Sequence, residues 1–464
     1  MRMRGGMLRT WAGVGCAVGL GISGCATKSP PERDQIVADA LPATVIPGVW
    51  GEAARQGSVP DGWVKSFNDR GLEAVVGEAL KNNLDLRAAQ ARLDQAGAAA
   101  AAAGASLNPV VDATGGGVVQ GGASDNRVTS RGVGLNMSWE LDVWGRVRSQ
   151  AAAATELYEG AELDFEFARQ SIAAAAAKAY FLATETLQQQ SLAAADVEAG
   201  EETARVIGLR RAAGKVTEQD VRLAQAELNA SKNRLAAAEN AHDQAVRALE
   251  TLLGRYPSNE LSTGATLPEM PGEVPAGIPS EVLERRPDVA AAERRVRGAF
   301  QNVQAKQLAK LPRIALTSGI GVNSGLTDLT SRGGGFFNVG ANFFAPVFDG
   351  GAREAEVRIA TAEQEQALAA YGQTALKAFL DVENALGGEA TLAEREALIA
   401  AAVRDAEEAL RLRTLEADAG KADTLSVLQL QRQVFAGRST LVALRTARRS
   451  LRVDLHMALG GDFQ

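Results

Sequence analysis

Cysteine and histidine are almost missing from this sequence. Its 464 residues include two cysteines, Cys16 and Cys25, and two histidines. Cys16 lies in an N-terminal segment that the sequence predicts to be removed, so the mature chain can form neither an internal disulfide nor a cysteine metal site. Two histidines are too few for a histidine metal site. We therefore expect no metal, and a fold that packing alone stabilises.

Basic residues are not in excess, and the patterns of enzyme sites are missing as well. The formal net charge is −7, whereas a nucleic-acid partner favours a basic stripe. No nucleophile paired with a base, no phosphate-binding loop and no metal cluster stands out. We expect neither an enzyme nor a nucleic-acid-binding protein, and no cofactor apart from a covalent lipid.

Proline is missing from two long stretches of the chain. All 14 prolines lie at or before residue 109, from 257 to 312, or at Pro346. Proline removes a backbone donor, and the two gaps are rich in Ala, Leu, Glu, Gln and Arg, so both gaps predict long helices. The run from Arg146 to about Arg211 would span about 100 Å as a helix. That is longer than a globular core needs, and typical of a tube that crosses the periplasm.

The chain begins with a basic start and a short apolar run. The run, residues 11–22, falls below the roughly 20 apolar residues that a spanning helix needs, which predicts a signal peptide over 1–24. Residues 22–25, Ile-Ser-Gly-Cys, resemble a bacterial lipobox, so Cys25 is expected to carry a covalent lipid. Ala26 is typical of outer-membrane sorting. An ordinary signal peptide with an unrelated cysteine is the alternative.

The two halves of the chain repeat each other. Asn108-Pro109 and Leu311-Pro312 lie 203 residues apart, whereas Gly214-Lys215, Gln225 and Leu253-Gly254 each recur 206 residues later. The small drift falls in the β-like region, which indicates a duplicated structural unit. The predicted division is a lipidated N-terminal extension over 25–65, a first repeat over 66–256, a linker over 257–279, and a second repeat over 280–464.

The helix after each Gly-Lys turn carries a seven-residue pattern, which predicts left-handed coiled-coil packing. His242 and Arg448 occupy the same position in the two halves. We interpret them as polar positions at an interface or facing a watery lumen. The apolar row that contains them is Val221, Leu228, Leu235 and Leu249 in the first half, and Val427, Val434, Leu441 and Leu455 in the second.

Each half also contains two stretches in which apolar and polar residues alternate. They predict hairpins over about 110–144 and about 313–348, with the last strand reaching Val347. One apolar face of this length is typical of a membrane strand, and a soluble hairpin packed on helices is the alternative. Aromatic residues that could form interfacial girdles are Trp139, Trp144, Phe336, Phe343 and Phe348.

Four strands cannot close a membrane barrel, because the smallest barrels use eight. We therefore expect three copies to assemble. The predicted fold class is mainly α with a membrane β-barrel part. Each chain would supply a duplicated unit of long coiled-coil helices and two β-hairpins to a trimeric, 12-stranded barrel continuous with an α-helical barrel.

With these features the sequence resembles the outer-membrane factor family of bacterial efflux systems, the TolC and OprM type, in its NodT lipoprotein branch. The similarity runs from Cys25 to about Gly460. Arg286-Pro287-Asp288 belongs to one of its motifs, and we interpret this string as a helix start rather than an anion site. The matching segments are 79–86 with Trp63, Phe67 and Leu72 before it, 278–289 with Ala292 and Glu293 after it, and 346–351.

The resemblance implies a function, a location and partners. It implies the exit duct of a tripartite RND-type efflux system in the bacterial outer membrane, lipid-anchored, with a long periplasmic portion. The implied partners are two further copies of the chain, a periplasmic adaptor or membrane fusion protein, an inner-membrane RND transporter and outer-membrane lipid. The exit duct of a type I protein secretion system is an alternative, and a periplasmic coiled-coil scaffold without a pore is a further one.

The resemblance also implies a gate at two helical tips, which would gather at the periplasmic end and close it. Ser426 and Gln429 stand where related tips carry an acidic ring, so a cation trap is not carried over. Opposite charges could latch the closed state, and Glu218 and Asp418 add to the charges nearby. The candidate residues for the gate and for adaptor docking are Arg210, Arg211, Gly214, Lys215, Asp220, Arg413, Glu416, Gly420, Lys421 and Asp423.

Overall fold

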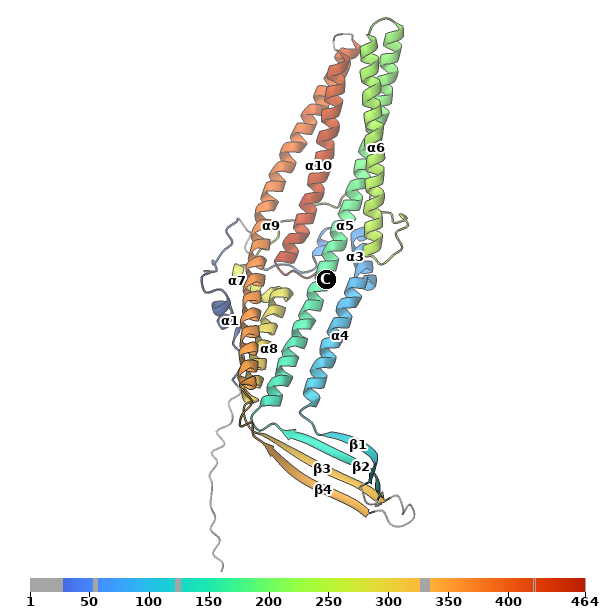
Figure 1. Cartoon of the computed structure of the whole chain (residues 1–464). Coiled ribbons are helices and arrows are strands. Elements are labelled where there is room, and N and C mark those ends of the chain that lie inside the picture. Colours follow the sequence, from blue (N-terminus) through green and yellow to red (C-terminus); the bar gives the residue numbers. More distant parts are fainter. Residues whose placement is uncertain are drawn as a thin grey trace, which may run out of the picture.

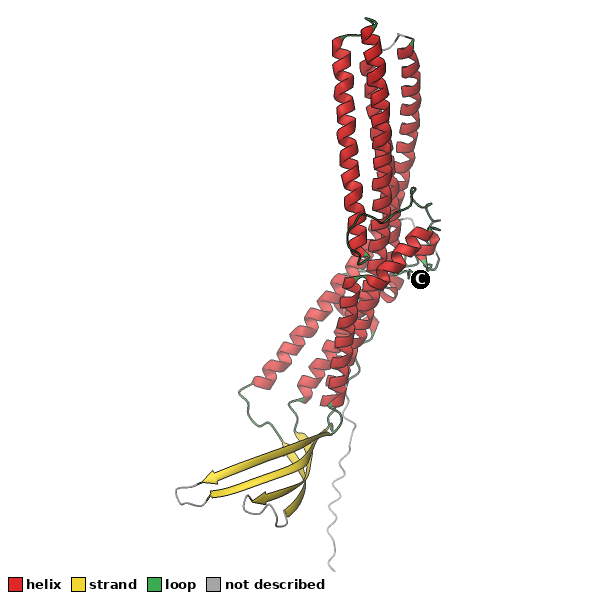
Figure 2. Ribbon diagram, turned by 90° about the vertical axis from the view of Figure 1, so that its right-hand side faces the viewer, coloured by secondary structure: helices red, strands yellow, loops and turns green. Residues whose placement is uncertain are grey.

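The computed structural model describes residues 28–52, 57–121, 127–325, 334–419, 421 and 423–463. Cys25 and Gly420, both candidate site residues, lie outside the described residues. The molecule is elongated, with a β-sheet at one end and the turns of two long helical hairpins at the other (Figures 1 and 2). No helix within the described ranges combines the length and the apolarity needed to cross a membrane.

The helices occur in two matching sets. The longest, α5 and α9, have 67 residues each, their partners α6 and α10 have 35 each, and α4 and α8 have 22 each. Equal lengths in both halves are what a duplicated unit produces. The bounds are α1 Arg33–Ala40, α2 Trp63–Ser66, α3 Arg70–Asn82, α4 Leu84–Ala105, α5 Arg146–Ala212, α6 Glu218–Leu252, α7 Pro279–Arg285, α8 Pro287–Leu308, α9 Ala352–Asp418 and α10 Thr424–Ala458.

A glycine marks the same close approach in both halves. Gly254, after α6, has φ +72°, and a Cβ there would lie 2.7 Å from the carbonyl oxygen of Asn82. Gly460, after α10, has φ +69°, and a Cβ there would lie 2.9 Å from the backbone of Arg285. A side chain fits neither site, because both the backbone conformation and the space require glycine. The ends of α6 and α10 that lie away from the hairpin turns, which we name the roots of the hairpins, are therefore packed alike.

The four strands form one antiparallel sheet in the order β1-β2-β3-β4. Their bounds are β1 Val110–Gly121, β2 Arg127–Leu141, β3 Arg313–Gly325 and β4 Gly334–Phe344. The last strand ends at Phe344, so the predicted extension to Val347 is wrong. Pro346 explains the early end, because it cannot donate to a strand ladder. Within the described residues, β1 and β4 are edges with one strand neighbour each.

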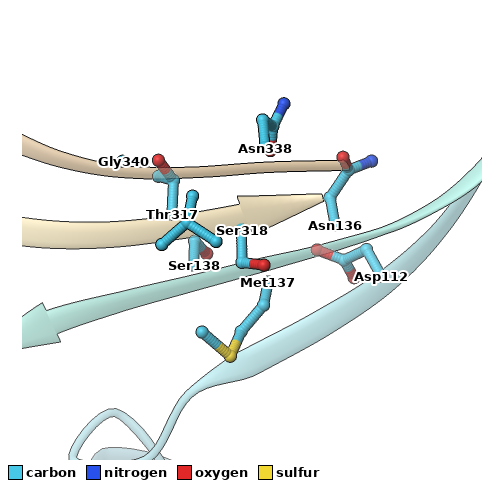
Figure 3. A pocket seen from close by; sticks show the side chains of 9 residues that line it. Asp112, Asn136, Met137, Ser138, Thr317, Ser318, Asn338 and Gly340 are labelled. Atoms are coloured by element: carbon cyan, nitrogen blue, oxygen red, sulfur yellow. The ribbon is translucent and has the colours of Figure 1, made fainter. Parts of the chain in front are cut away.

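The two faces of the sheet differ in polarity. Asn136 pairs with Asp112 on one side and with Gly319 on the other, and its side chain donates to Thr114 Oγ1 at 2.7 Å. Figure 3 shows Asn136 and Asn338 on one side of the strands and Met137 on the opposite side. The opposite face is apolar and exposed: Leu135, Ile320 and Phe337 are 51%, 62% and 83% exposed. One apolar and one polar face is the pattern of a membrane strand.

The junction between sheet and helices is held by two tryptophans. Trp139 Nε1 donates to the carbonyl oxygen of Leu107 at 2.9 Å, and Trp144 Nε1 donates to that of Pro312 at 2.6 Å. Trp144 follows β2, and Phe348 follows β4 and is 92% exposed. Of the aromatic residues expected in girdles, these two lie beyond the strands rather than in them.

The heptad rows pack α6 on α5 and α10 on α9. Leu228 and Leu249 on α6 are buried, as are Val427 and Val434 on α10. The polar positions in these rows also face the neighbouring long helix. His242 Nδ1 lies 3.2 Å from Thr186 Oγ1, and Arg448 Nη1 donates to Glu396 Oε2 at 3.1 Å. Of the two alternatives for these positions, an interface or a watery lumen, the contacts within one chain favour the interface.

The large buried side chains gather at mid-length, at the roots of the hairpins. Phe67 and Phe181 lie with ring centroids 5.3 Å apart in the core of the first half. In the second half, Tyr371 and Val382 of α9 are buried in the core, and Trp50 donates from Nε1 to the carbonyl oxygen of Ala276 at 3.0 Å. The packing core therefore fixes the roots and leaves the tips remote from it.

His456, near the end of α10, makes this core sensitive to acid. Its ring is 2% exposed, stacks on Trp63 at 6.1 Å, and has no hydrogen-bond partner for either nitrogen among the described residues. Burial, with Arg452 nearby, lowers the pKa of His456 from 6.5 to about 4. The unfolded chain therefore takes up this proton first, and stability falls as the pH drops from about 6.5 to about 4, by about 3 kcal/mol.

We predict that His456→Phe removes this part of the pH dependence. The thermal unfolding midpoint of the wild type should drop between pH 7 and pH 4.5, and that of the variant should drop less. His242→Gln controls for the loss of a histidine and should behave as the wild type does. An equal drop in the wild type and in His456→Phe would show that the ring does not govern the acid response.

Candidate functional site at the helical tips

The first tip is a tight turn between α5 and α6. The Gly214 N–H donates to Arg211 O and the Lys215 N–H donates to Arg210 O, both at 2.9 Å. Gly214 has φ +70° and open space where a Cβ would stand. These bonds satisfy the last carbonyls of α5, and a left-handed residue is what such a helix end requires. Gly214 is needed for its backbone conformation, not for space.

The second tip, between α9 and α10, repeats this geometry. The Lys421 N–H donates to Glu416 O at 2.8 Å, which is the counterpart of the bond from Lys215 to Arg210. Lys215 and Lys421 are exposed, and neither has an ion-pair partner in the part of the chain that the structure describes. Their charges are therefore available to solvent or to a partner.

Asp220 and Asp423 start the outgoing helices. The Thr217 N–H donates to Asp220 Oδ2 at 2.8 Å, and the Asp220 N–H donates to Thr217 Oγ1 at 3.2 Å, a reciprocal cap. Asp423 Oδ1 accepts from the Ser426 N–H at 2.7 Å. These bonds hold the pKa of each aspartate below its usual value: the Thr217 hydroxyl and N–H act on Asp220, and the Ser426 N–H and hydroxyl act on Asp423. Both carboxylates therefore stabilise the turns through these hydrogen bonds.

One ion pair joins the two tips. Arg210 Nη2 lies 3.0 Å from Asp418 Oδ1, with the side chains 26% and 63% exposed. An exposed pair of this kind contributes about 0–1 kcal/mol, so the link is weak and easily replaced.

Two further arginines pair within their own tip. Arg211 lies 3.6 Å from Glu218 at the first tip. Arg413 at the second tip pairs with Glu416 at 2.9 Å and donates to Ser426 Oγ at 2.7 Å. Among the tip charges that the structure describes, Arg210 and Asp418 form the ion pair between the hairpins, and the pairs of Arg211 and Arg413 stay within one hairpin.

Sequence reasoning missed two features of the site. It named Asp418 among the charges near the second tip but did not pair it with Arg210, since an offset of 206 residues aligns Asp418 with Ala212 and gives no sign of this contact. It also missed a group of exposed leucines around the charged turns. Leu209, Leu412, Leu415 and Leu425 are 61%, 48%, 55% and 44% exposed. Exposed apolar side chains beside weakly held charges are typical of a surface that meets a partner.

The outer membrane efflux protein family matches residues 75–255 and 278–461, which together take in both hairpins and the sheet. The chain belongs to this family. Within the described ranges, no group of three or more His, Cys, Asp or Glu side chains is placed to hold a metal ion. The predicted fold class, mainly helical with a β-part in an outer-membrane channel, is confirmed, and the protein is an outer-membrane efflux duct.

Curated relatives match over most of their length. The pyoverdine export outer membrane protein OpmQ of Pseudomonas aeruginosa is 32% identical over 420 residues, 87% of each chain. The cation efflux system protein CusC of Escherichia coli is 30% identical over 420 residues, 86% of this chain and 88% of the relative.

Solved structures agree on the whole architecture. The MtrE outer membrane channel of Neisseria gonorrhoeae, in its open state, gives a TM-score of 0.83 at 28% identity, covering 95% of this chain and 99% of that one. The CmeC outer membrane channel of Campylobacter jejuni gives 0.84 at 25% identity, covering 89% and 90%. These relatives are channels rather than enzymes.

Gly214 provides a matched test of the tip geometry, because Gly208 in α5 also has open space for a Cβ but ordinary helical backbone. We predict that Gly214→Ala destabilises the first tip by about 1 kcal/mol through left-handed strain. Gly208→Ala should be neutral or stabilising by up to about 1 kcal/mol. Amide hydrogen exchange of residues 207–219 measures both. Similar exchange rates in the two variants would contradict the assigned turn.

Proposed function

We propose that this chain is the exit duct of a tripartite efflux system of the RND type, working as a homotrimer. The observation that carries the proposal is a four-stranded sheet with two open edges joined to two hairpins of equal length. Four strands are too few for a membrane barrel, whereas three copies supply twelve. The same threefold arrangement places six helical hairpins around one axis, as a tube beneath the barrel.

The two faces of the sheet support the orientation of the proposed barrel. The exposed apolar face, which includes Leu135 and Phe337, would meet lipid. The opposite face, with Asp112, Asn136 and Thr317, would line a watery lumen. This separation matches the alternation of membrane barrels and gives the duct its passage.

The tips would form the gate and the docking surface for a periplasmic adaptor, which in turn contacts the inner-membrane transporter. The Arg210–Asp418 pair is exposed, so a partner that offers its own charges can replace it at little cost. The exposed leucines nearby supply apolar area for the same contact. Opening would then follow from docking and would need no chemical step in this chain.

The cargo would be small molecules or ions, selected elsewhere in the system. Relatives of similar identity bear the names of a pyoverdine exporter and of a cation efflux protein. A passive and unselective conduit explains why one architecture serves such different cargo. It also fits a lumen-facing sheet surface of amides, hydroxyls and glycines, which includes the open pocket of Figure 3 lined by Asn136, Thr317 and Asn338.

A lipid on Cys25 would add a second attachment to the membrane. Lys28 N lies 3.3 Å from Gln304 Oε1, close to the end of α8 and the start of β3 at Arg313. The described chain therefore begins near the end of the helices next to the sheet. In the proposed duct this is the level at which a barrel-bound chain would meet the inner surface of the outer membrane, where acyl chains can insert.

The gate predicts a charge-swap effect. Arg210→Glu should raise the open fraction of the channel in planar bilayers by up to about fivefold for each protomer, because one exposed pair is lost. The double variant Arg210→Glu with Asp418→Arg should restore the closed state. Arg205→Glu, which breaks a pair within α5 only, is the control. A double variant that conducts as freely as the single one would rule out this latch. No conductance in any variant would rule out a duct.

The anchor predicts an effect on retention without an effect on fold. Cys25→Ala should leave the helical content and the assembly unchanged and should increase the fraction released from outer membranes by mild washing. Incorporation of labelled palmitate should disappear in the same variant. Full retention together with loss of label would show that the barrel alone suffices as an anchor.

A further inference from the structure

The segment 255–278, which we name the belt, connects the two halves across the middle of the molecule. Figure 1 shows it running from the foot of α6 to α7, past the roots of the hairpins. Loops on a surface are usually held by few contacts. The belt is instead held by charged side chains from both hairpins, of which Glu250, Arg449 and Arg452 are buried. Acidic side chains hold one end of the belt, and basic side chains hold the other.

At the first end, α6 holds the belt with acidic side chains. Glu250 is 1% exposed, and its carboxylate accepts the backbone N–H groups of residues 259–261 at 2.8, 2.9 and 3.0 Å. Asp243 Oδ1 accepts from the side chain of Asn259 at 2.8 Å. Hydrogen bonds to an ionised group are about twice as strong as neutral ones, so this end is firmly fixed.

At the second end, α10 holds the belt with basic side chains. Arg452 is 2% exposed, pairs with Glu389 of α9, and donates to the carbonyl oxygens of Pro271, at 3.0 Å, and Gly272. Arg449, 9% exposed, donates to the carbonyl oxygen of Pro268. A buried guanidinium that loses these oxygens keeps only part of its hydrogen bonding, because Glu389 remains for Arg452 and the carbonyl oxygen of Arg445 for Arg449, and unmet buried donors make release costly.

Between these ends the belt also touches α5. The Gly264 N–H donates to Tyr180 Oη at 3.3 Å, and Gln188 Nε2 donates to the carbonyl oxygen of Ala265 at 3.2 Å. The belt is therefore bound in turn to α6, α5 and α10, and through Glu389 to α9. Each long helix of both hairpins is connected to it.

The contacts that hold the belt differ between the two repeats, so they are specific to this segment. Asp243 and Arg449 occupy equivalent positions 206 residues apart, and both hold the belt with opposite charge. Glu250 is equivalent to His456, which makes no side-chain hydrogen bond among the described residues. A structural feature inherited with the repeat would appear alike in both halves. The acidic side chains on α6 match backbone N–H groups, and the basic ones on α10 match backbone carbonyls.

We propose that the belt couples the two hairpins mechanically, with Asp243, Glu250, Arg449 and Arg452 as positioning residues. A displacement at the root of α9 and α10 pulls on the belt at residues 268–272 and is carried to α6 through residues 259–261. The two tips of one protomer then open together rather than one at a time. This coupling rests on the proposed function only in that the hairpins move during opening.

The test measures distances at the tip of one hairpin while side chains on the other hairpin are substituted. A spin label at Ala213→Cys in the purified full-length protein reports distances between the first tips of neighbouring protomers. Arg452→Met and Arg449→Met alter side chains on the other hairpin that have no contact with the first tip. We expect either variant to raise the open component of the first-tip distances by about tenfold. Arg438→Met, which removes an α10 arginine paired with Glu407 and remote from the belt, should leave them unchanged.

The reverse experiment uses a label at Thr414→Cys on the second tip and the isosteric change Glu250→Gln on α6. Coupling is reciprocal, so the second-tip distances should also shift, by a similar factor. Changes confined to the tip of the altered hairpin, or unchanged distances at both tips, overturn the proposal.

A cut made after assembly guards against variants that fail to fold. A protease site placed at the exposed Ala265-Thr266 lets the belt be severed in the finished protein. Cutting should broaden the distances at both tips, and unchanged distances after complete cleavage overturn the proposal. Failure of the proposed function would instead appear as a lack of conductance while the distances still respond.

Discussion

The structure depends on the demand that every backbone polar group in a bilayer be paired. The sheet has four strands and leaves the outer edges of β1 and β4 without a neighbour in the described chain. Edges of this kind cannot remain open in hydrocarbon, where an unpaired N–H or C=O costs several kcal/mol. Among the described residues, nothing covers the exposed apolar face of the same sheet. When several copies close a barrel, the strand edges pair with each other and the apolar face meets lipid. The helices attached to each sheet are then brought around a common axis.

Stability is distributed unevenly along the resulting tube. Aromatic and aliphatic side chains are concentrated at the hairpin roots, where Trp63, Phe67, Phe181 and Tyr371 are buried. The tips depend on helix caps and on exposed ion pairs, each of which contributes little. Regions of low local stability are where movement occurs at small cost. A firm root, a belt held by charged side chains and a weakly paired tip are what the proposed gate would need if a docking partner is to operate it.

Much of the fold could be predicted because it depends on local pattern. The gaps in proline predicted α5 with α6 and α9 with α10, and the alternation after Pro109 and Pro312 predicted the hairpins. The matching bonds of Lys215 and Lys421 to the ends of α5 and α9 followed from the repeat. The end of β4 was overestimated because Phe343, Phe344 and Val347 continue the alternation past the point where Pro346 stops the ladder.

Contacts between distant segments could not be predicted in this way. Arg210 meets Asp418 across two hairpins, and Arg452 meets the belt 180 residues away. No periodicity encodes such pairs, since they depend on the relative placement of packed helices. The repeat does not help here, because equivalent positions such as Glu250 and His456 have unlike surroundings.

Closure of the barrel by three copies is tested most directly by crosslinking β1 to β4. Within one chain the two edge strands are three strand spacings apart, about 14 Å, which is too far for a disulfide. Cysteine pairs placed one on each edge strand, over a panel of registers, can therefore join only different chains. Closure by three predicts a covalent ladder that stops at three chains under oxidation in membranes. A ladder that continues beyond three, or a product that stays at one or two chains in every register, would contradict it.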